Sequence, residues 1–75
     1  MKTYPVNIIW DPEAEVWVAT SSDIGGLVLE SGSLDALIEK IKYAVPELLE
    51  LNMGDKVTAL PLSIKTERTI DIKVG

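Results

Sequence analysis

The sequence predicts a small α+β domain of two layers, in which one amphipathic helix backs an antiparallel β-sheet and the elements follow the order β-β-β-α-β. Three patterns lead to this prediction. Apolar residues alternate along residues 4–20, recur with a helical period from 34 to 52, and alternate again from 57 to 74. One helix packed on one sheet buries both sets of apolar side chains, so it is the simplest architecture for these elements.

The first two predicted strands, residues 4–10 and 15–20, form a hairpin. The first, "YPVNIIW", places apolar side chains at every second position, and the second, "EVWVAT", is rich in β-branched and aromatic residues. Between them, "DPEA" has turn chemistry, because an Asp side chain can bond back to the backbone and Pro presets the turn dihedral.

The register of this hairpin decides where the two tryptophans lie. A four-residue turn at "DPEA" places Trp10 opposite Glu15, with both rings on one face of the sheet. A turn longer by one residue places Trp10 opposite Val16 and sends the rings to opposite faces. We favour the second register, in which Trp17 and Ile9 share the outer face and become candidates for contact with a subunit or partner. That register gathers one apolar face from Val6, Ile8, Trp10, Val16 and Val18.

The segment "SSDIGG" is expected to be a loop leading to a short third strand at 27–30. Gly25 and Gly26 permit backbone conformations that other residues avoid, and Asp23 precedes them. Ser33 is the expected N-cap of the following helix. We therefore assign structural roles, in the loop and the cap, to Asp23, Gly25, Gly26 and Ser33.

One helix is predicted over residues 34–52. Steps of about 100° per residue gather its large apolar side chains on one broad face. This sorting continues across Pro46, which indicates one kinked helix rather than two. Tyr43 lies in the middle of the polar face, where it is either a lone exposed tyrosine or a contact residue, since tyrosine is enriched at interfaces. The apolar face comprises Leu34, Leu37, Ile38, Ile41, Ala44, Val45, Leu48, Leu49 and Leu51.

The last segment, "VTALPLSIKTERTIDIKV", is predicted to be one long strand. Its apolar residues keep even numbering throughout, and "KTER" has no Gly or Asn to make a tight turn. A strand of about fifteen residues at roughly 3.3 Å each would reach about 50 Å. Such a strand must bend or pair outside its own fold, so we expect a homodimer or higher homo-oligomer.

The composition excludes several kinds of chemistry. The 75 residues include no cysteine and no histidine, which removes disulfides, thiolate metal sites and the commonest general base. Carboxylates are then the only plausible catalytic groups, and acidic residues in turns are usually solvated. We expect no catalytic residue, no metal site and no cofactor. The alternative is a metal-dependent nuclease that uses Asp11, Glu13 or Asp23.

Charge and hydropathy limit the partners. The net charge of −5 argues against direct nucleic-acid binding and suits a basic protein partner. The sequence shows neither an apolar run long enough for a membrane span nor a signal-peptide core, so we expect a cytoplasmic protein that does not bind membranes. We expect residues 1–75 to form one domain. The scarcity of Asn and Gln is typical of thermophilic sources.

The run "SDIGGLVLESGSLDAL" resembles the HicB-like antitoxins. Their N-terminal domains carry a Pro-Asp-Leu-Pro-Gly loop, a short strand and a Gly-Asp-Thr cap on a Leu-rich helix. Asp23 and Gly26 match that loop and Ser33 stands for the capping Thr, whereas Ser22 and Gly25 replace the two prolines. The chain is more similar still to short, stand-alone HicB-like proteins of unknown function.

The resemblance implies a HicB-like fold and a partner. In the wider family, the domain neutralises HicA, a small basic ribonuclease toxin, and a further C-terminal segment binds DNA. This chain has no counterpart of that segment, so direct DNA contact is not expected. The leading hypothesis is a non-catalytic protein-interaction module that binds a small basic partner such as a HicA-type toxin. A free-standing structural or ligand-binding domain is the third possibility.

Overall fold

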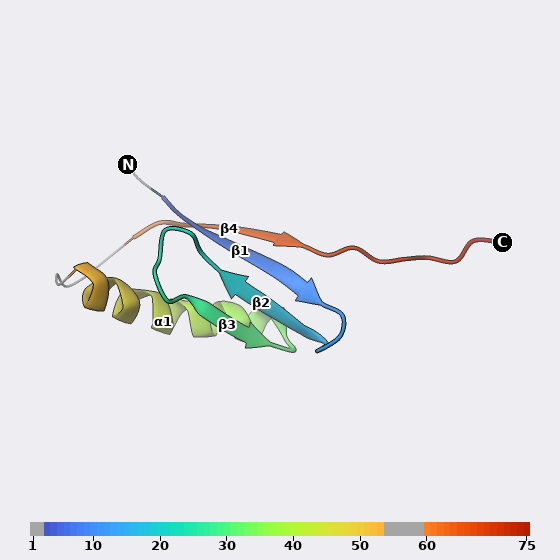
Figure 1. Cartoon of the computed structure of the whole chain (residues 1–75), viewed down its shortest axis with the longest axis horizontal. Coiled ribbons are helices and arrows are strands. Elements are labelled where there is room, and N and C mark those ends of the chain that lie inside the picture. Colours follow the sequence, from blue (N-terminus) through green and yellow to red (C-terminus); the bar gives the residue numbers. More distant parts are fainter. Residues whose placement is uncertain (1–2, 54–59) are drawn as a thin grey trace.

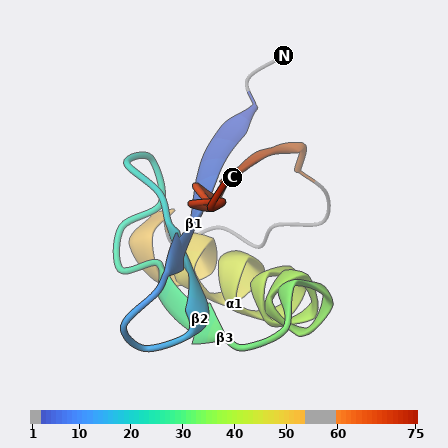
Figure 2. The ribbon, with the colours of Figure 1, turned by 90° about the vertical axis from the view of Figure 1, so that its right-hand side faces the viewer.

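The computed structural model describes residues 3–53 and 60–75, and it confirms the α+β fold class and the predicted order of elements. The helix lies against one face of a four-stranded sheet, which gives two layers (Figures 1 and 2). The elements are β1 (Tyr4–Asp11), β2 (Val16–Thr20), β3 (Val28–Ser31), α1 (Leu34–Met53) and β4 (Leu62–Glu67).

The sheet is mixed, whereas we expected antiparallel strands throughout. Its order is β3-β2-β1-β4, with β1–β2 and β2–β3 antiparallel and β1–β4 parallel. The helix is the reason for the parallel pair. It carries the chain back along the sheet after β3, so β4 starts from the same end as β1 and runs beside it in the same direction.

The favoured hairpin register is wrong. Trp10 lies opposite Trp17 and Asp11 opposite Val16, so the turn consists of residues 12–15. Asp11 Oδ1 accepts hydrogen bonds from the backbone N–H groups of Glu13 at 3.0 Å and Ala14 at 3.3 Å. Glu15 closes the turn with a φ of 56°, in the left-handed region. The turn is therefore shifted by one residue relative to "DPEA". The two tryptophans share one face of the sheet, as they would with a four-residue turn at "DPEA", but they lie directly opposite each other.

The core lies between the sheet and the helix. It includes alternate residues of β1 and one face of α1, which runs through Pro46 as the single predicted helix. Leu51, which the helical period placed on the apolar face, is 80% exposed because it lies beyond the last core residue of the helix. Two loop residues, Ile24 and Leu27, are buried as deeply as the strands. The full set of buried apolar side chains is Val6, Ile8, Ala19, Ile24, Leu27, Leu37, Ile41, Val45 and Leu49.

The loop and the helix cap have defined backbone chemistry. The Leu27 N–H donates to the Ile24 carbonyl at 3.3 Å, and Gly26 within this turn has a φ of 84°. Gly25 does not take a positive φ, so only the second glycine needs its conformational freedom. At the helix start, Ser33 Oγ accepts a hydrogen bond from the Ala36 N–H at 3.3 Å, as an N-cap residue does.

The chain after β4 leaves the domain. Residues 68–75, which we call the C-terminal arm, continue beyond the β1–β2 turn without folding back (Figure 1). The arm makes the molecule long, with extents of 56 × 24 × 18 Å. The final segment thus contains no hairpin, as predicted. Within its described residues, however, only β4 pairs with a neighbouring strand. Its first residues, 57–59, lie outside the described residues.

Candidate interaction site at the hairpin end

The two tryptophans form one aromatic pair on the helix side of the sheet, near the β1–β2 turn. Their ring centroids are 5.3 Å apart and the rings are inclined by 65°, an edge-to-face arrangement. Positive ring edge and negative ring face then attract each other. Both side chains are partly buried, so the pair closes the hairpin end of the core without being removed from the surface.

Arg68 covers this pair from the end of β4. Its guanidinium carbon lies 4.1 Å from the centroid of the Trp10 ring and 5.7 Å from that of Trp17. The parallel pairing explains this position, because β1 and β4 are in register up to Ile9 and Glu67 and the next step brings Arg68 beside Trp10. A guanidinium over an indole face is a favourable cation–π contact, so it fixes the point at which the arm leaves the domain.

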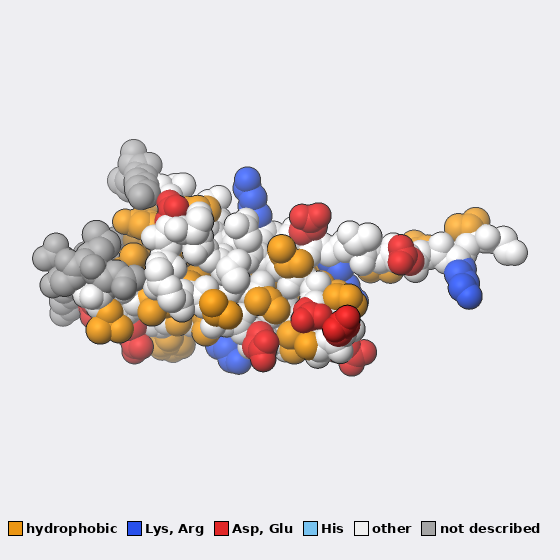
Figure 3. Space-filling view, viewed as in Figure 1, with side chains coloured by type: hydrophobic (Ala, Val, Ile, Leu, Met, Phe, Trp, Pro, Cys, Tyr) orange, Lys and Arg blue, Asp and Glu red, His pale blue; other side chains and the backbone are white. Residues whose placement is uncertain are grey.

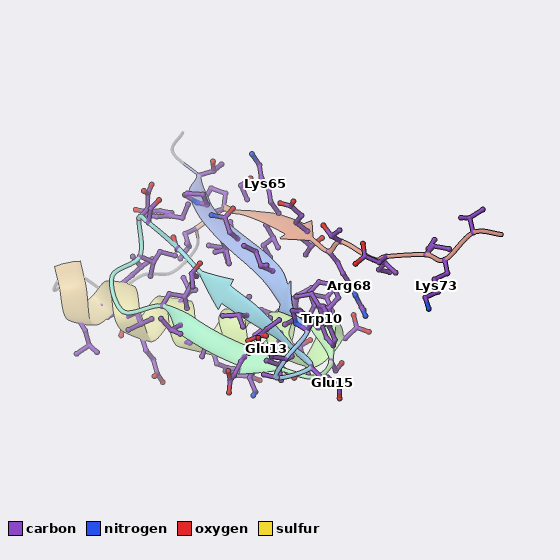
Figure 4. All side chains as sticks on the ribbon, turned by 45° about the vertical axis from the view of Figure 1, so that its right-hand side comes forward. Trp10, Glu13, Glu15, Lys65, Arg68 and Lys73 are labelled. Atoms are coloured by element: carbon purple, nitrogen blue, oxygen red, sulfur yellow. The ribbon has the colours of Figure 1, made fainter. Side chains whose placement is uncertain are left out.

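Acidic side chains gather at the same end of the molecule. Glu13 and Glu15 extend from the β1–β2 turn (Figure 4), and red side chains collect around this end in the space-filling view (Figure 3). Glu13 and Glu15 are exposed, and Asp11 is used partly to cap the turn. Exposed carboxylates around a partly buried aromatic pair form a surface that can attract a cationic partner.

The three residues that we predicted as contacts lie on three different surfaces. Trp17 lies on the helix side of the sheet beside Trp10, not on the outer face. Ile9 lies on the outer face, where it is 55% exposed and lines an open hollow of about 740 Å³. Tyr43 is 77% exposed on the side of α1 away from the sheet. The structure therefore does not bring them together into one patch.

The carboxylates of the nuclease alternative are also separated. Asp11 ends β1 and Glu13 lies in the β1–β2 turn, whereas Asp23 follows the far end of β2, in the loop before β3. Within residues 3–53 and 60–75, no group of three His, Cys, Asp or Glu side chains is placed to hold a metal ion. No geometric observation in this part of the chain favours metal-dependent chemistry.

Ser21 has a structural role that the sequence analysis missed. Its hydroxyl donates to the Pro5 carbonyl and accepts from the N–H groups of Asp23 and Ile24, each at 3.2 Å. These bonds hold the loop after β2 against the start of β1 and direct Ile24 into the core. The signal was present as a Ser at the first position of a loop, where its hydroxyl can bond to backbone two and three residues ahead.

A family model and one solved structure match nearly the whole chain. Residues 3–74 match a domain of unknown function (DUF1902). The crystal structure of a hypothetical protein, TTHA1013, from the extremely thermophilic bacterium Thermus thermophilus is similar, with 40% identity and a TM-score of 0.71. The match covers 97% of this chain and 100% of that one. A comparison with curated proteins finds no match.

Within the described residues, α1 is too polar to cross a membrane. The family match extends over nearly the whole chain and the similar crystal structure over all of its own chain, so the same elements are compared from β1 to the arm. The chain therefore belongs to the DUF1902 family of domains of unknown function.

Proposed function

We propose that this chain is a non-catalytic protein-interaction module, and that its hairpin end binds a small basic protein of the HicA toxin type. One observation carries the proposal: exposed Glu13 and Glu15 lie in the β1–β2 turn, at the strand ends that carry the aromatic pair. The net charge of −5 adds a long-range attraction for a cationic partner. The resemblance of "SDIGGLVLESGSLDAL" to HicB-like antitoxins supports the class of partner.

The aromatic pair and the carboxylates have different parts in this proposal. Trp10 and Trp17 are partly buried, and the exposed parts of their rings offer an apolar surface of the kind that dominates binding energy at interfaces. The turn carboxylates accelerate the encounter and orient the partner, because charges at the edge of an interface act mainly on the association rate. Arg68 lies over the Trp10 ring of its own chain, and Glu13 and Glu15 of the turn remain exposed.

Binding of a purified HicA-type toxin tests the proposal, with calorimetry measuring the affinity and stopped-flow mixing the association rate. The charge-reversed variant Glu13→Lys/Glu15→Lys is expected to bind about tenfold or more weakly, mainly through slower association. The matched control is Glu47→Lys/Glu50→Lys, which makes the same charge change in the far half of α1 and is expected to bind like the unmodified chain.

Growth of cells that express the toxin gives a second measurement. The unmodified chain and the helix control are expected to restore growth, and the hairpin variant is not. The proposal is wrong if the unmodified chain neither binds the toxin nor restores growth. Equal loss of binding in both charge-reversed variants would place the binding surface elsewhere.

A further inference from the structure

The C-terminal arm displays an apolar surface with no partner in its own domain. Ile70, Ile72 and Val74 are 66%, 78% and 93% exposed. They continue the even-numbered series of Leu62 and Ile64 in β4, which face the core side of the sheet. Three large, exposed apolar side chains at alternate positions of one segment are uncommon on a free surface.

The geometry of β1 explains why the arm has no neighbouring strand in its own domain. The β1–β4 pairing has Ile9 opposite Glu67, and β1 ends at Asp11, where the chain turns into β2. From about Ile70 onward, the arm therefore has no neighbouring strand along β1. The outer edge of β4 is open as well, since β4 is the last strand in the sheet order among the described residues.

We propose that the arm binds a second copy of this chain, by antiparallel pairing with the outer edge of β4. Each copy would contribute an arm and a β4 edge, so that one two-fold axis satisfies both. The two sheets would join into one continuous sheet, with both helices on the same side. Strand addition of this kind satisfies the backbone groups of the edge and the arm together. The inference goes beyond the proposed function, since it needs no basic partner.

Side-chain alternation limits the registers that the arm can take on β4. Directly opposed residues of antiparallel strands lie on the same face, so the even residues of the arm must oppose even residues of β4. The register that places Ile64 opposite Ile72 of the second copy also places Leu62 opposite Val74. Each pair occurs twice about the two-fold axis, which gives one apolar strip continuous with the core side of the sheet.

Charges on the other face favour the same register. With Ile64 opposite Ile72, Lys65 lies opposite Asp71 of the second copy, an attractive pair that also occurs twice. A shift that places Ile64 opposite Val74 would instead put Lys65 opposite Lys73 and Glu67 opposite Asp71. Like charges directly opposed across strands are destabilising.

Arg68 lies at the two-fold axis in this register, next to Arg68 of the second copy. Each guanidinium is held over the Trp10 ring of its own chain, 4.1 Å from the centroid, which keeps the charge on its own domain. The same contact fixes the direction in which the arm leaves β4. The arm is thereby presented as a strand before the second copy arrives, which lowers the ordering cost of association.

The mass of the full chain in solution, measured by sedimentation equilibrium, tests whether a second copy of the chain binds the arm. The unmodified chain is expected at twice its 8.2 kDa chain mass at micromolar concentrations. The variant Ile70→Ser/Ile72→Ser/Val74→Ser is expected at the single-chain mass, with unchanged circular dichroism because these residues lie outside the core. The matched control, Tyr43→Ser/Leu51→Ser, removes two equally exposed apolar side chains from α1 and is expected to keep the double mass.

Charge reversal tests the register. Lys65→Asp and Asp71→Lys are each expected to weaken dimerisation about tenfold, since each replaces two attractive cross-strand pairs by two repulsive ones. The double variant is expected to return to within about threefold of the unmodified chain. A single-chain mass for the unmodified protein, an arm variant that keeps the double mass, or a double variant weaker than both single variants would each overturn the proposal.

Discussion

Trp10 and Trp17 face each other directly across the β1–β2 hairpin, with ring centroids 5.3 Å apart and an interplanar angle of 65°. This contact closes the end of the domain at which the acidic turn, Arg68 and the C-terminal arm meet (Figure 4). Both proposals depend on this end, one for a basic partner and the other for a second copy.

The aromatic pair is expected to contribute to stability as a pair. In a double-mutant cycle of Trp10→Leu and Trp17→Leu, the coupling in the free energy of unfolding should be about 1 kcal/mol, the usual value for an edge-to-face contact. Urea denaturation at one fixed chain concentration provides the measurement. A control cycle of Trp10→Leu with Leu49→Ala, in the far half of α1, should be additive; equal coupling in both cycles would contradict the contact.

Arg68 is expected to stabilise the domain through the indole rings. Arg68→Ala should lower the free energy of unfolding by about 0.5–1 kcal/mol, because an exposed cation–π contact is lost, and Arg68→Lys should keep part of it. The measurement is best made in the variant with three arm serines, so that assembly does not contribute. Lys73→Ala, farther along the arm, is the control. A loss no larger than that of the control would exclude the contact.

The side chain of Ser21 is expected to contribute more to the free energy of unfolding than that of Ser22. Ser21→Ala removes the bond to the Pro5 carbonyl and both bonds from the loop N–H groups, which should cost about 1–2 kcal/mol of unfolding free energy. Ser22→Ala is the matched control. The Ser22 hydroxyl donates to the exposed carboxylate of Asp23 at 3.3 Å, so its loss should change stability by less than about 0.5 kcal/mol. Equal effects would show that the loop is held by other contacts.

Gly26 is expected to tolerate no side chain without strain. Its φ of 84° disfavours any L-residue, so Gly26→Ala should lower the unfolding free energy by about 1–2 kcal/mol. The added Cβ would lie 3.4 Å from Leu48 Cδ2, an ordinary contact, so the backbone conformation is the cause. Gly32→Ala, at a position without positive φ, is the control and should have little effect.

The sequence was sufficient for the element order because alternation and helical period are properties of neighbouring residues. It also indicated that the helix continues through Pro46 and that the last strand does not fold back. The hairpin register was missed because the turn depends on a left-handed Glu15, and a glutamate gives no sequence signal for that conformation. The parallel β1–β4 pair depends on the path of the chain around the sheet, which local patterns do not encode.

The candidate site could be predicted only in part. The position of Tyr43 on the exposed side of α1 follows from the helical period, whereas the face of Trp17 depended on the register and was wrong. Nothing in the sequence near Arg68 points to the tryptophans, since more than fifty residues separate it from Trp10. Contacts between distant segments arise from the sheet pairing and need the structure.

Disulfide trapping of the arm against β4 is the sharpest test of the proposed dimer, because the chain has no cysteine of its own. In Ile64→Cys/Ile72→Cys, the two thiols of one chain are about 26 Å apart along an extended strand, too far to bond to each other. We predict a disulfide-linked dimer on a non-reducing gel, and little of it from the control Ile64→Cys/Lys73→Cys, whose thiols would lie on opposite faces. Absence of the linked dimer, or equal yields from both variants, would contradict the proposed assembly.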